Sequence, residues 1–446
     1  MLVADVVVVG AGLAGSRMCA LLRSAGHSGR LTLLGAEPDP PYDRPPLTKD
    51  PEAEVDLRAA MDVDVWADAD EVLLGVRATR LLARPARAAG APEPLVVECS
   101  DGVERTARAV VLATGADPVL PEGWSRPGVF VLHSRAQARA VWSAIGPGRD
   151  VVIIGGGWIG CEAASTASSR GARVVLRESG PSVLAGRVPE GVAARVARWL
   201  VDAGVTLSVG DEVASVDAGS AGTAIEGHPA DVVLVALGVR PATGWLSDSG
   251  LEVSAEGAVL VDPVGRASVP GVFAVGDCAA RWSPRRGAHL PGGHWTEALN
   301  APERVAPAVV QWLAEGPGGH PWDRTRARPA LPDSGPADPI PYVFSEIAGR
   351  TLLLLGAPES GRVVWREAPG IAPGSRQVPS VSEEAWTAFS IDSADRLVGL
   401  CTVGRPRDLV AARRAMLAHP SGTPTTDPAA LADPTAAPTA MFPGEP

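Results

Sequence analysis

The sequence predicts an α/β protein with two Rossmann-type domains and a C-terminal α+β domain. Three observations predict this fold class. Four β-branched residues at 6–9 run into a Gly-x-Gly-x-x-Gly turn, the arrangement recurs at 151–160, and an apolar block at 342–419 mixes strand-like and helix-like stretches. Because strand, glycine turn and helix begin a doubly wound βαβ unit, the recurrence indicates two separate parallel sheets.

The first glycine turn predicts a dinucleotide site. Gly10 permits the sharp turn, Gly12 lets a pyrophosphate approach the backbone, and Gly15 lets the helix pack closely on the strand. The phosphates would lie at the helix N-terminus, and Glu37 could accept hydrogen bonds from ribose hydroxyls. A buried strand, turn and helix without a ligand is the alternative.

Composition narrows the possible partners. The chain has 446 residues, 46% of them hydrophobic and 20% charged, with a net charge of -11. This balance argues against nucleic acid or an anionic membrane as the main partner. The N-terminus enters a strand at Val3 without a leader pattern, and no apolar run approaches about 18 residues, so we expect a cytoplasmic protein.

Five scattered cysteines form no C-x-x-C pattern. Their spacing indicates a reducing compartment and excludes both a zinc cluster and a local redox dithiol, so no metal site is predicted.

Lys49 is the only lysine among 40 basic residues and follows a proline-rich stretch at 40–46. The prolines stiffen an extended segment. A single lysine in an arginine-rich protein suggests a site that suits a compact ammonium better than a guanidinium. The alternative is that Lys49 is present by chance and has no functional role.

The second glycine turn predicts a second dinucleotide. Its acid, Glu178, lies 18 residues after Gly160 and would accept from a 2′-hydroxyl while repelling a 2′-phosphate, which favours NADH over NADPH. We expect the neighbouring Arg177 to keep this preference moderate. The predicted NADH-binding residues are Gly155, Gly156, Gly157, Trp158, Ile159, Gly160 and Glu178.

Two further strand ends carry candidate residues. Small residues at Ala113, Thr114 and Gly115 would let a ligand or another backbone approach. Asp277 ends a buried strand and is either a helix N-cap or the acceptor of a polyol such as the ribityl chain of a flavin. A helical run that Pro302 interrupts or kinks follows.

We expect a first part of one nucleotide-binding domain at 1–117, a second nucleotide-binding domain at 118–246, and the rest of the first domain at 247–320. A Pro/Gly-rich linker at 321–340, a C-terminal domain at 341–419 and a disordered tail at 420–446 follow.

Together these segments resemble the oxygenase-coupled NADH:ferredoxin reductases, relatives of rubredoxin and putidaredoxin reductase with a glutathione-reductase-like fold. The proline-flanked Leu47-Thr48-Lys49 stretch is the most specific, and Ala274 to Asp277, His294-Trp295 and 341–345 follow in the family's order. The resemblance implies FAD at the first turn and NADH at the second. The implied FAD-binding residues are Gly10, Ala11, Gly12, Leu13, Ala14, Gly15, Glu37, Arg44, Lys49, Ala113, Thr114, Gly115, Asp277, His294 and Trp295.

The resemblance also implies that Glu162 pairs with Lys49 beside the flavin ring, both as catalytic residues. A first-turn acid stabilised by the helix dipole is the alternative for Glu162. Three positions depart from the family: His133 replaces a FAD-contacting arginine, Pro302 a glycine and Phe344 a tryptophan.

The implied function is transfer of electrons from NADH through FAD, one at a time, to a [2Fe-2S] ferredoxin or similar carrier serving an oxygenase. Arg281, Arg285 and Arg286 could steer an acidic carrier, or form an ordinary solvated loop. Two alternatives are a NADH-dependent flavoprotein acting directly on a small molecule, and a redox-sensing protein like apoptosis-inducing factor.

Overall fold

The structure is a computed structural model. It describes residues 2–49, 56–83, 94–219, 222–284, 286–315, 339–367, 385–419, 422–425 and 427–442. The chain forms two compact units, each assembled from separate stretches. The first unit contains Met1–Arg44, Glu54–Asp117 and Val239–Asp338, and the second contains Pro45–Ala53, Pro118–Gly238 and Pro339–Pro446.

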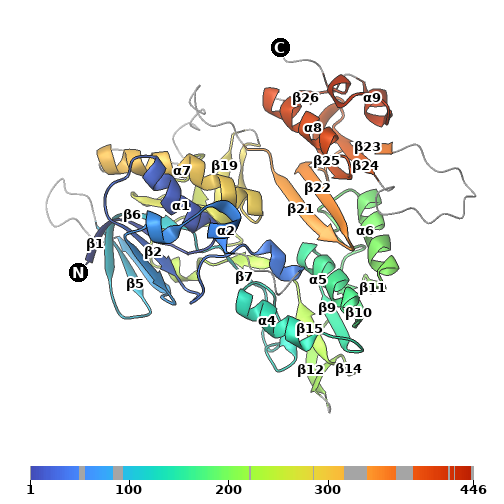
Figure 1. Cartoon of the computed structure of the whole chain (residues 1–446), viewed down its shortest axis with the longest axis horizontal. Coiled ribbons are helices and arrows are strands. Elements are labelled where there is room, and N and C mark those ends of the chain that lie inside the picture. Colours follow the sequence, from blue (N-terminus) through green and yellow to red (C-terminus); the bar gives the residue numbers. More distant parts are fainter. Residues whose placement is uncertain are drawn as a thin grey trace, which may run out of the picture. The chain divides into compact units, whose positions relative to one another are not determined.

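The first unit is built on a mixed sheet with the strand order β3-β2-β1-β6-β5-β4, to which β18 adds by pairing with β6 (Figure 1). Strand β1 lies parallel to both of its neighbours. The strands are β1 (Leu2–Val9), β2 (Leu31–Gly35), β3 (Glu71–Leu74), β4 (Ala78–Ala83), β5 (Leu95–Cys99), β6 (Arg105–Leu112) and β18 (Val272–Ala274).

The β-branched run at the start of the chain is buried on both faces of this sheet. Val6 and Val8 pack on the side of helices α1 (Leu13–Ser24) and α7 (Trp295–Glu315), which contact each other. Val7 and Val9 belong to the core on the opposite side. A strand covered on both faces needs apolar residues at every position, which explains the unbroken run.

Helix α7 continues without interruption through Pro302 and Pro307. Of the two predicted effects of Pro302, interruption of the helix is therefore wrong, whereas a kink stays a prediction. Proline removes one backbone donor from a helix, but Pro302 is buried beside Ala301 and Val305, whose packing against the core holds the helix together.

The second unit contains a parallel sheet with the order β11-β10-β9-β15-β8. Its strands are β8 (Val129–Phe130), β9 (Asp150–Ile154), β10 (Arg173–Glu178), β11 (Thr206–Val209) and β15 (Val232–Val235). Its helices are α4 (Arg135–Ala144), α5 (Trp158–Ser169) and α6 (Glu190–Asp202). The chain therefore contains the two Rossmann-type sheets that the repeated glycine turns predict.

The C-terminal part of this unit is an antiparallel sheet with the order β21-β22-β25-β24-β23, to which β26 adds at β25. Its elements are β21 (Tyr342–Ile347), β22 (Arg350–Gly356), β23 (Arg362–Glu367), β24 (Trp386–Ile391), β25 (Arg396–Val403), α8 (Pro406–Ala418), β26 (Thr423–Pro424), α9 (Pro428–Ala432) and the 3-10 helix η6 (Pro438–Ala440). With this sheet the predicted fold class is confirmed.

Part of the predicted disordered tail instead adopts regular structure, because residues 422–425 and 427–442 contain β26, α9 and η6. Leu431, Met441 and Phe442 are buried in the same core cluster as α8. The buried guanidinium of Arg366 donates a hydrogen bond to the Ala436 carbonyl and so ties the tail to β23. A few apolar residues and one internal cation are enough to hold a segment of otherwise polar composition.

Short elements complete the two units. The first contains α2 (Leu57–Met61), α3 (Val65–Asp68), β7 (Ala116–Pro118), β16 (Val239–Pro241), β17 (Val259–Val261), β19 (Ala279–Ser283), β20 (Ala288–Pro291) and the 3-10 helices η2 (Gly244–Leu246) and η3 (Gly276–Cys278). The second contains β12 (Val216–Gly219), β13 (Gly222–Ile225), β14 (His228–Ala230) and the 3-10 helix η1 (Pro45–Thr48). Residues 321–338 of the predicted linker lie outside the described residues. Among the described helices, none has both the length and the apolar character needed to cross a bilayer.

Candidate active site

Backbone geometry requires glycine at two positions of the first turn. Gly10 has a φ of +116°, and a Cβ placed on it would lie 2.1 Å from the Ala113 carbonyl oxygen. A Cβ on Gly15 would lie 1.8 Å from the Gly10 carbonyl oxygen. Both contacts are too short for any other residue, so the start of α1, the turn and the end of β6 pack together only with glycine present.

Gly12 differs from Gly10 and Gly15 because a side chain at this position would point into open space instead of into packed backbone atoms. Gly12 is the N-cap of α1 and supplies no side-chain cap. Among the described residues, and apart from its chain neighbours, no atom lies within 4 Å of a Cβ placed on it. An open position directly before an uncapped helix N-terminus fits a phosphate group, whose charge the helix dipole and free N–H groups favour.

Glu37 follows β2 and is oriented by two neighbours. The Tyr42 hydroxyl donates to Oε2 at 2.5 Å, and Arg44 Nη2 donates to Oε1 at 2.6 Å. A carboxylate offers about four lone-pair directions, so each oxygen can accept more than one hydrogen bond. Arg44 thus contacts the predicted ribose acceptor in the first unit.

Asp277 lies within the 3-10 helix η3, whose N-cap is Val275. The N-cap interpretation of Asp277 is therefore wrong. Burial raises the pKa of the Asp277 carboxyl, while hydrogen bonding to the Gly293 backbone and the charge of Arg44 oppose this effect. Trp295 begins α7 after His294, and its Nε1 donates to Asp43 Oδ1 at 2.7 Å, which fixes the helix start to the proline-rich stretch.

The end of β6 also contributes to this side of the first unit. Thr114 Oγ1 donates to the Ala242 carbonyl oxygen at 2.9 Å, and Gly115 adopts a φ of +70°. The residues Ala113 to Gly115 therefore sit where the backbone of the first turn approaches the sheet, as their small size predicts.

The second turn repeats the geometry of the first. Gly155 has a φ of +106° and a Cβ on it would lie 2.5 Å from the Ala236 carbonyl oxygen, while a Cβ on Gly160 would lie 1.9 Å from the Gly155 oxygen. Gly157 is the uncapped N-cap of α5 and has no atom within 4 Å of a Cβ. Both turns therefore fit a dinucleotide.

Glu178 ends β10 beside this second turn. Gly156 N–H donates to Oε2 and Gly180 N–H donates to Oε1, each at 2.6 Å. Two backbone donors hold the carboxylate at the place where the 2′-hydroxyl of an adenosine ribose is expected. The Arg177 guanidinium instead pairs with Asp211, to which Nε donates at 2.8 Å, and with Glu226, to which Nη1 donates at 3.0 Å.

Lys49 and Glu162 form an ion pair within the second unit. Lys49 Nζ lies 2.8 Å from Glu162 Oε2, 3.0 Å from the Pro45 carbonyl oxygen and 3.3 Å from Thr48 Oγ1. Three acceptors match the three N–H donors of an ammonium. The other predicted FAD-binding residues belong to the first unit, whereas Lys49 belongs to the second.

The Glu162 carboxylate is buried and receives four donors. Thr48 Oγ1 donates to Oε2 at 2.5 Å, and on the other oxygen Ser345 Oγ donates at 2.6 Å and Glu346 N–H at 3.0 Å. Helix α5 begins at Trp158 and has no acid in its first turn. The helix-dipole interpretation of Glu162 is therefore wrong.

Two residues that the sequence did not single out anchor the Lys49 segment. Trp142 Nε1 donates to the Leu47 carbonyl oxygen at 2.7 Å, and Thr166 Oγ1 donates to the Thr48 carbonyl oxygen at 2.8 Å. The sequence around Trp142 does not indicate that its indole N–H donates to a backbone carbonyl far away in the chain. The segment thus joins the second unit through side chains of α4 and α5.

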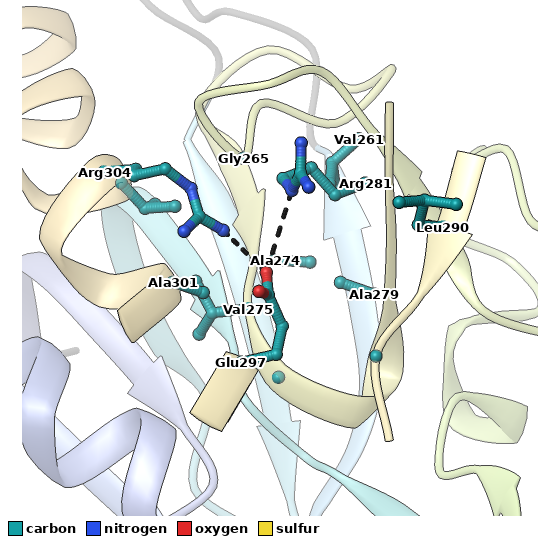
Figure 2. Close-up of a pocket in the computed structure, with 13 residues that line it drawn as sticks. Val261, Gly265, Ala274, Val275, Ala279, Arg281, Leu290, Glu297, Ala301 and Arg304 are labelled. Atoms are coloured by element: carbon teal, nitrogen blue, oxygen red, sulfur yellow. Dashed lines mark hydrogen bonds and ion pairs between the residues drawn. The ribbon is translucent and has the colours of Figure 1, made fainter. Parts of the chain in front are cut away.

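Arg281, one of the three arginines predicted to steer an acidic carrier, is buried in the first unit beside a small cavity (Figure 2). Arg281 and Arg304 both point toward Glu297 (Figure 2). Arg281 Nε lies 3.8 Å from Glu297 Oε1, and Arg304 Nη2 lies 2.6 Å from the same oxygen. The Arg281 side chain is only 10% exposed and the Arg304 side chain only 9%. The cavity beside them has a volume of about 20 Å³, roughly that of one water molecule. Arg281 therefore cannot meet a partner at the surface, whereas Arg286 is exposed and Arg285 lies outside the described residues.

The other departures from the family lie in the second unit. His133 precedes Ser134, the N-cap of α4, and its backbone N–H donates to Oε1 of Gln137, which forms the capping box with Ser134. Phe344 is half-buried in β21, opposite Leu353 of β22.

Comparison with known proteins decides the family. Residues 4–309 match the model of the pyridine nucleotide-disulphide oxidoreductases. The chain belongs to this family. The oxidoreductase is 30% identical to the ferredoxin--NAD(+) reductase component of the anthranilate 1,2-dioxygenase system of Burkholderia cepacia over 96% of the chain and 97% of the relative.

Other relatives extend this result. The oxidoreductase is 30% identical to the ferredoxin--NAD(+) reductase subunit of the benzene 1,2-dioxygenase system of Pseudomonas putida, over 93% of the chain and 92% of the relative. The crystal structure of the ferredoxin reductase for the CYP199A2 system of Rhodopseudomonas palustris superimposes with a TM-score of 0.79 at 25% identity, covering 98% of this chain and 99% of the other. The predicted family and the predicted class, an NAD(P)H oxidoreductase of the ferredoxin--NAD(+) reductase type, are confirmed.

Proposed function

We propose that this oxidoreductase passes electrons from NADH through FAD, singly, to a [2Fe-2S] ferredoxin or similar carrier that serves an oxygenase. Two dinucleotide-shaped turns, each with two glycines that no other residue can replace, support the use of two cofactors. The full-length similarity to dioxygenase-system reductases supports the acceptor class. A cytoplasmic location and the predicted domain boundaries up to residue 419 are part of the same proposal.

The cysteines are the observation that favours one-electron transfer over transfer of an electron pair through a dithiol. All five are free and buried. Burial raises the pKa of the Cys19 thiol to about 12 and also raises the pKa values of Cys161 and Cys401. A thiol must ionise to attack or to exchange with a disulfide, so these residues are unsuited to relaying an electron pair through a dithiol.

Bound FAD supplies a ring that accepts hydride from NADH and releases electrons one at a time. In the first unit, Gly12 and the start of α1 would receive its pyrophosphate, Glu37 its ribose, and Asp277 its ribityl chain. In the second unit, Gly157 and Glu178 would orient the adenosine half of NADH. Lys49 supplies a fixed positive charge that favours an anionic product.

Anaerobic titration tests this function. The purified chain should be yellow, lose its flavin absorbance on addition of about one equivalent of NADH, and then be reoxidised faster by a [2Fe-2S] ferredoxin than by oxygen or quinones in a stopped-flow experiment. A colourless protein that cannot be reconstituted with FAD would refute the proposal. Preferential reoxidation by a quinone would instead favour direct action on a small molecule.

We expect NADH to exceed NADPH in kcat/KM by about 100-fold, since a carboxylate facing a 2′-phosphate costs several kcal/mol. Asp211 and Glu226 pair with Arg177 and neutralise its charge, which supports a stronger preference than the moderate one expected from the sequence. Asp211→Asn should therefore raise kcat/KM for NADPH several-fold with little change for NADH.

Asp150→Asn is the matched control for this comparison. Asp150 holds Arg173 at the opposite end of the same strand, with Nε and Nη2 donating at 2.7 Å each. This variant should leave the cofactor ratio unchanged. Equal kcat/KM for the two nucleotides in the unmodified protein would contradict the predicted preference.

We expect Arg286→Glu to slow reduction of an acidic ferredoxin about tenfold at low ionic strength, because charge reversal weakens electrostatic steering. Turnover of NADH with ferricyanide should remain unchanged. Arg77→Glu is the control, since Arg77 is also exposed in the first unit and its N–H likewise donates to a serine hydroxyl. Equal loss of both activities in Arg286→Glu would dismiss docking at this loop.

A further inference from the structure

Ser345, which is distant in sequence, contacts the Lys49–Glu162 ion pair through the Glu162 carboxylate. Glu162 Oε2 faces Lys49 and Thr48, while Oε1 faces Ser345 Oγ and Glu346 N–H. Each oxygen therefore has two donors. The carboxylate plane is fixed by contacts on both edges rather than by the lysine alone.

Ser345 is placed for this contact by strand β21. The strand packs beside α5, and Ser345 is 1% exposed whereas the Glu346 side chain is exposed. Side chains alternate between the faces of a strand, so Ser345 projects toward Glu162 while the next residue offers only its backbone N–H. The register of β21 with β22, in which Ser345 lies opposite Leu352, holds this arrangement.

The Ser345 hydroxyl affects how Glu162 binds Lys49. Hydrogen bonds to an ionised carboxylate are among the strong ones, and in a buried site they spread its negative charge over several donors. A carboxylate that loses one of the two donors on Oε1 is less firmly oriented, and the ammonium on Oε2 is then less well held. The pair is thus coupled to the C-terminal sheet.

We infer that Ser345 is a positioning residue that orients Glu162 and thereby sets the geometry and effective charge of Lys49. The contact itself is seen in the structure, whereas its effect on electron transfer depends on the proposed function. Ser345 acts through Glu162 and is not required to touch either cofactor.

The single lysine makes the contact directly measurable. An amine-reactive reagent can modify only one ε-amine in this chain, and its rate can be followed by peptide mass spectrometry. We expect Ser345→Ala to raise the rate of Lys49 modification several-fold in the purified full chain. Ser345→Thr, which retains a hydroxyl, should restore a rate close to that of the unmodified protein. An unchanged rate in Ser345→Ala would overturn the inference.

Ser390→Ala is the matched control. Ser390 is a fully buried serine in β24 of the same sheet, and its hydroxyl donates to the Pro358 carbonyl oxygen at 2.5 Å. This variant loses an equivalent hydrogen bond without contacting Glu162, so Lys49 modification should not change. An equal increase in both variants would mean general loosening of the sheet and would overturn the inference. If Ser345→Ala does not fold, Ser345→Cys, which keeps the side-chain volume but donates weakly, provides the same comparison.

Measurements on the flavin separate this inference from the proposed function. With FAD bound, Ser345→Ala should lower the rate of flavin reduction about tenfold with an unchanged KM for NADH, and shift the flavin potential to more negative values. A protein that binds no FAD would refute the proposed function, yet Lys49 reactivity would still test the contact. Unchanged flavin kinetics together with increased Lys49 reactivity would leave the contact intact and refute its influence on electron transfer.

Discussion

Replacing Lys49 with methionine is expected to lower the rate of flavin reduction by NADH about 100-fold, because loss of one fixed charge or donor at a reacting centre typically costs that much. Methionine has nearly the length of lysine without its charge. FAD content should be unchanged, since the glycine turn, Glu37 and Asp277 lie in the first unit while Lys49 lies in the second. Stopped-flow absorbance at saturating NADH measures the effect.

The remaining contacts of Glu162 make this variant interpretable. After loss of the ammonium, the buried carboxylate would still accept hydrogen bonds from Thr48, Ser345 and the Glu346 N–H. The fold should therefore survive, which thermal melting can verify. Lys49→Arg serves as the control for charge: a guanidinium keeps the charge but is too broad for the position between Pro45 and Glu162. A wild-type rate in Lys49→Met would remove Lys49 from the mechanism.

The sequence predicted best where the cause is local. Gly10, Gly15, Gly155 and Gly160 were identified from spacing, and each is confined by backbone atoms that lie nearby in the turn or at an adjacent strand end. The fold class followed from the same turns, because strand, turn and helix are determined over short stretches of sequence.

Contacts between distant residues were harder to predict. Thr48 and Ser345 reach Glu162 across 114 and 183 residues, and neither hydroxyl has a local pattern that indicates its partner. The Lys49–Glu162 pair was expected only through family resemblance. Its predicted role in catalysis stays a prediction.

Two predictions made from composition, a solvated Arg281 and a disordered tail, failed for the same reason. An arginine in a loop and a tail rich in proline, threonine and alanine are usually solvated. Arg281 is nevertheless buried because Glu297 provides an internal carboxylate, and residues 427–442 of the tail are packed because Arg366 and Leu431 anchor them. A single buried partner can reverse an average tendency, and that partner is visible only in three dimensions.

The glycine turn of the first unit offers a test that separates ligand binding from folding. Gly12→Ala is expected to abolish FAD binding while leaving the folded protein intact. The backbone at Gly12 is extended, with φ of -82° and ψ of -170°, so alanine is tolerated there. Its methyl group would meet no atom of the described residues within 4 Å, apart from those of its chain neighbours. The group would instead fill the space proposed for the pyrophosphate, and FAD content measured from the visible spectrum should be negligible.

Two further variants make the result decisive. Gly146→Ala, where a Cβ also meets no atom within 4 Å, should keep full FAD content and a normal melting temperature. Gly15→Ala places its methyl group 1.8 Å from the Gly10 carbonyl oxygen and should destabilise the first unit by about 1–3 kcal/mol or more through overpacking. Loss of FAD in Gly12→Ala with an unchanged melting temperature of the ligand-free protein can come only from the space above the turn. If Gly12→Ala retains FAD, the pyrophosphate does not lie at the start of α1, and the assignment of the first unit to FAD fails with it.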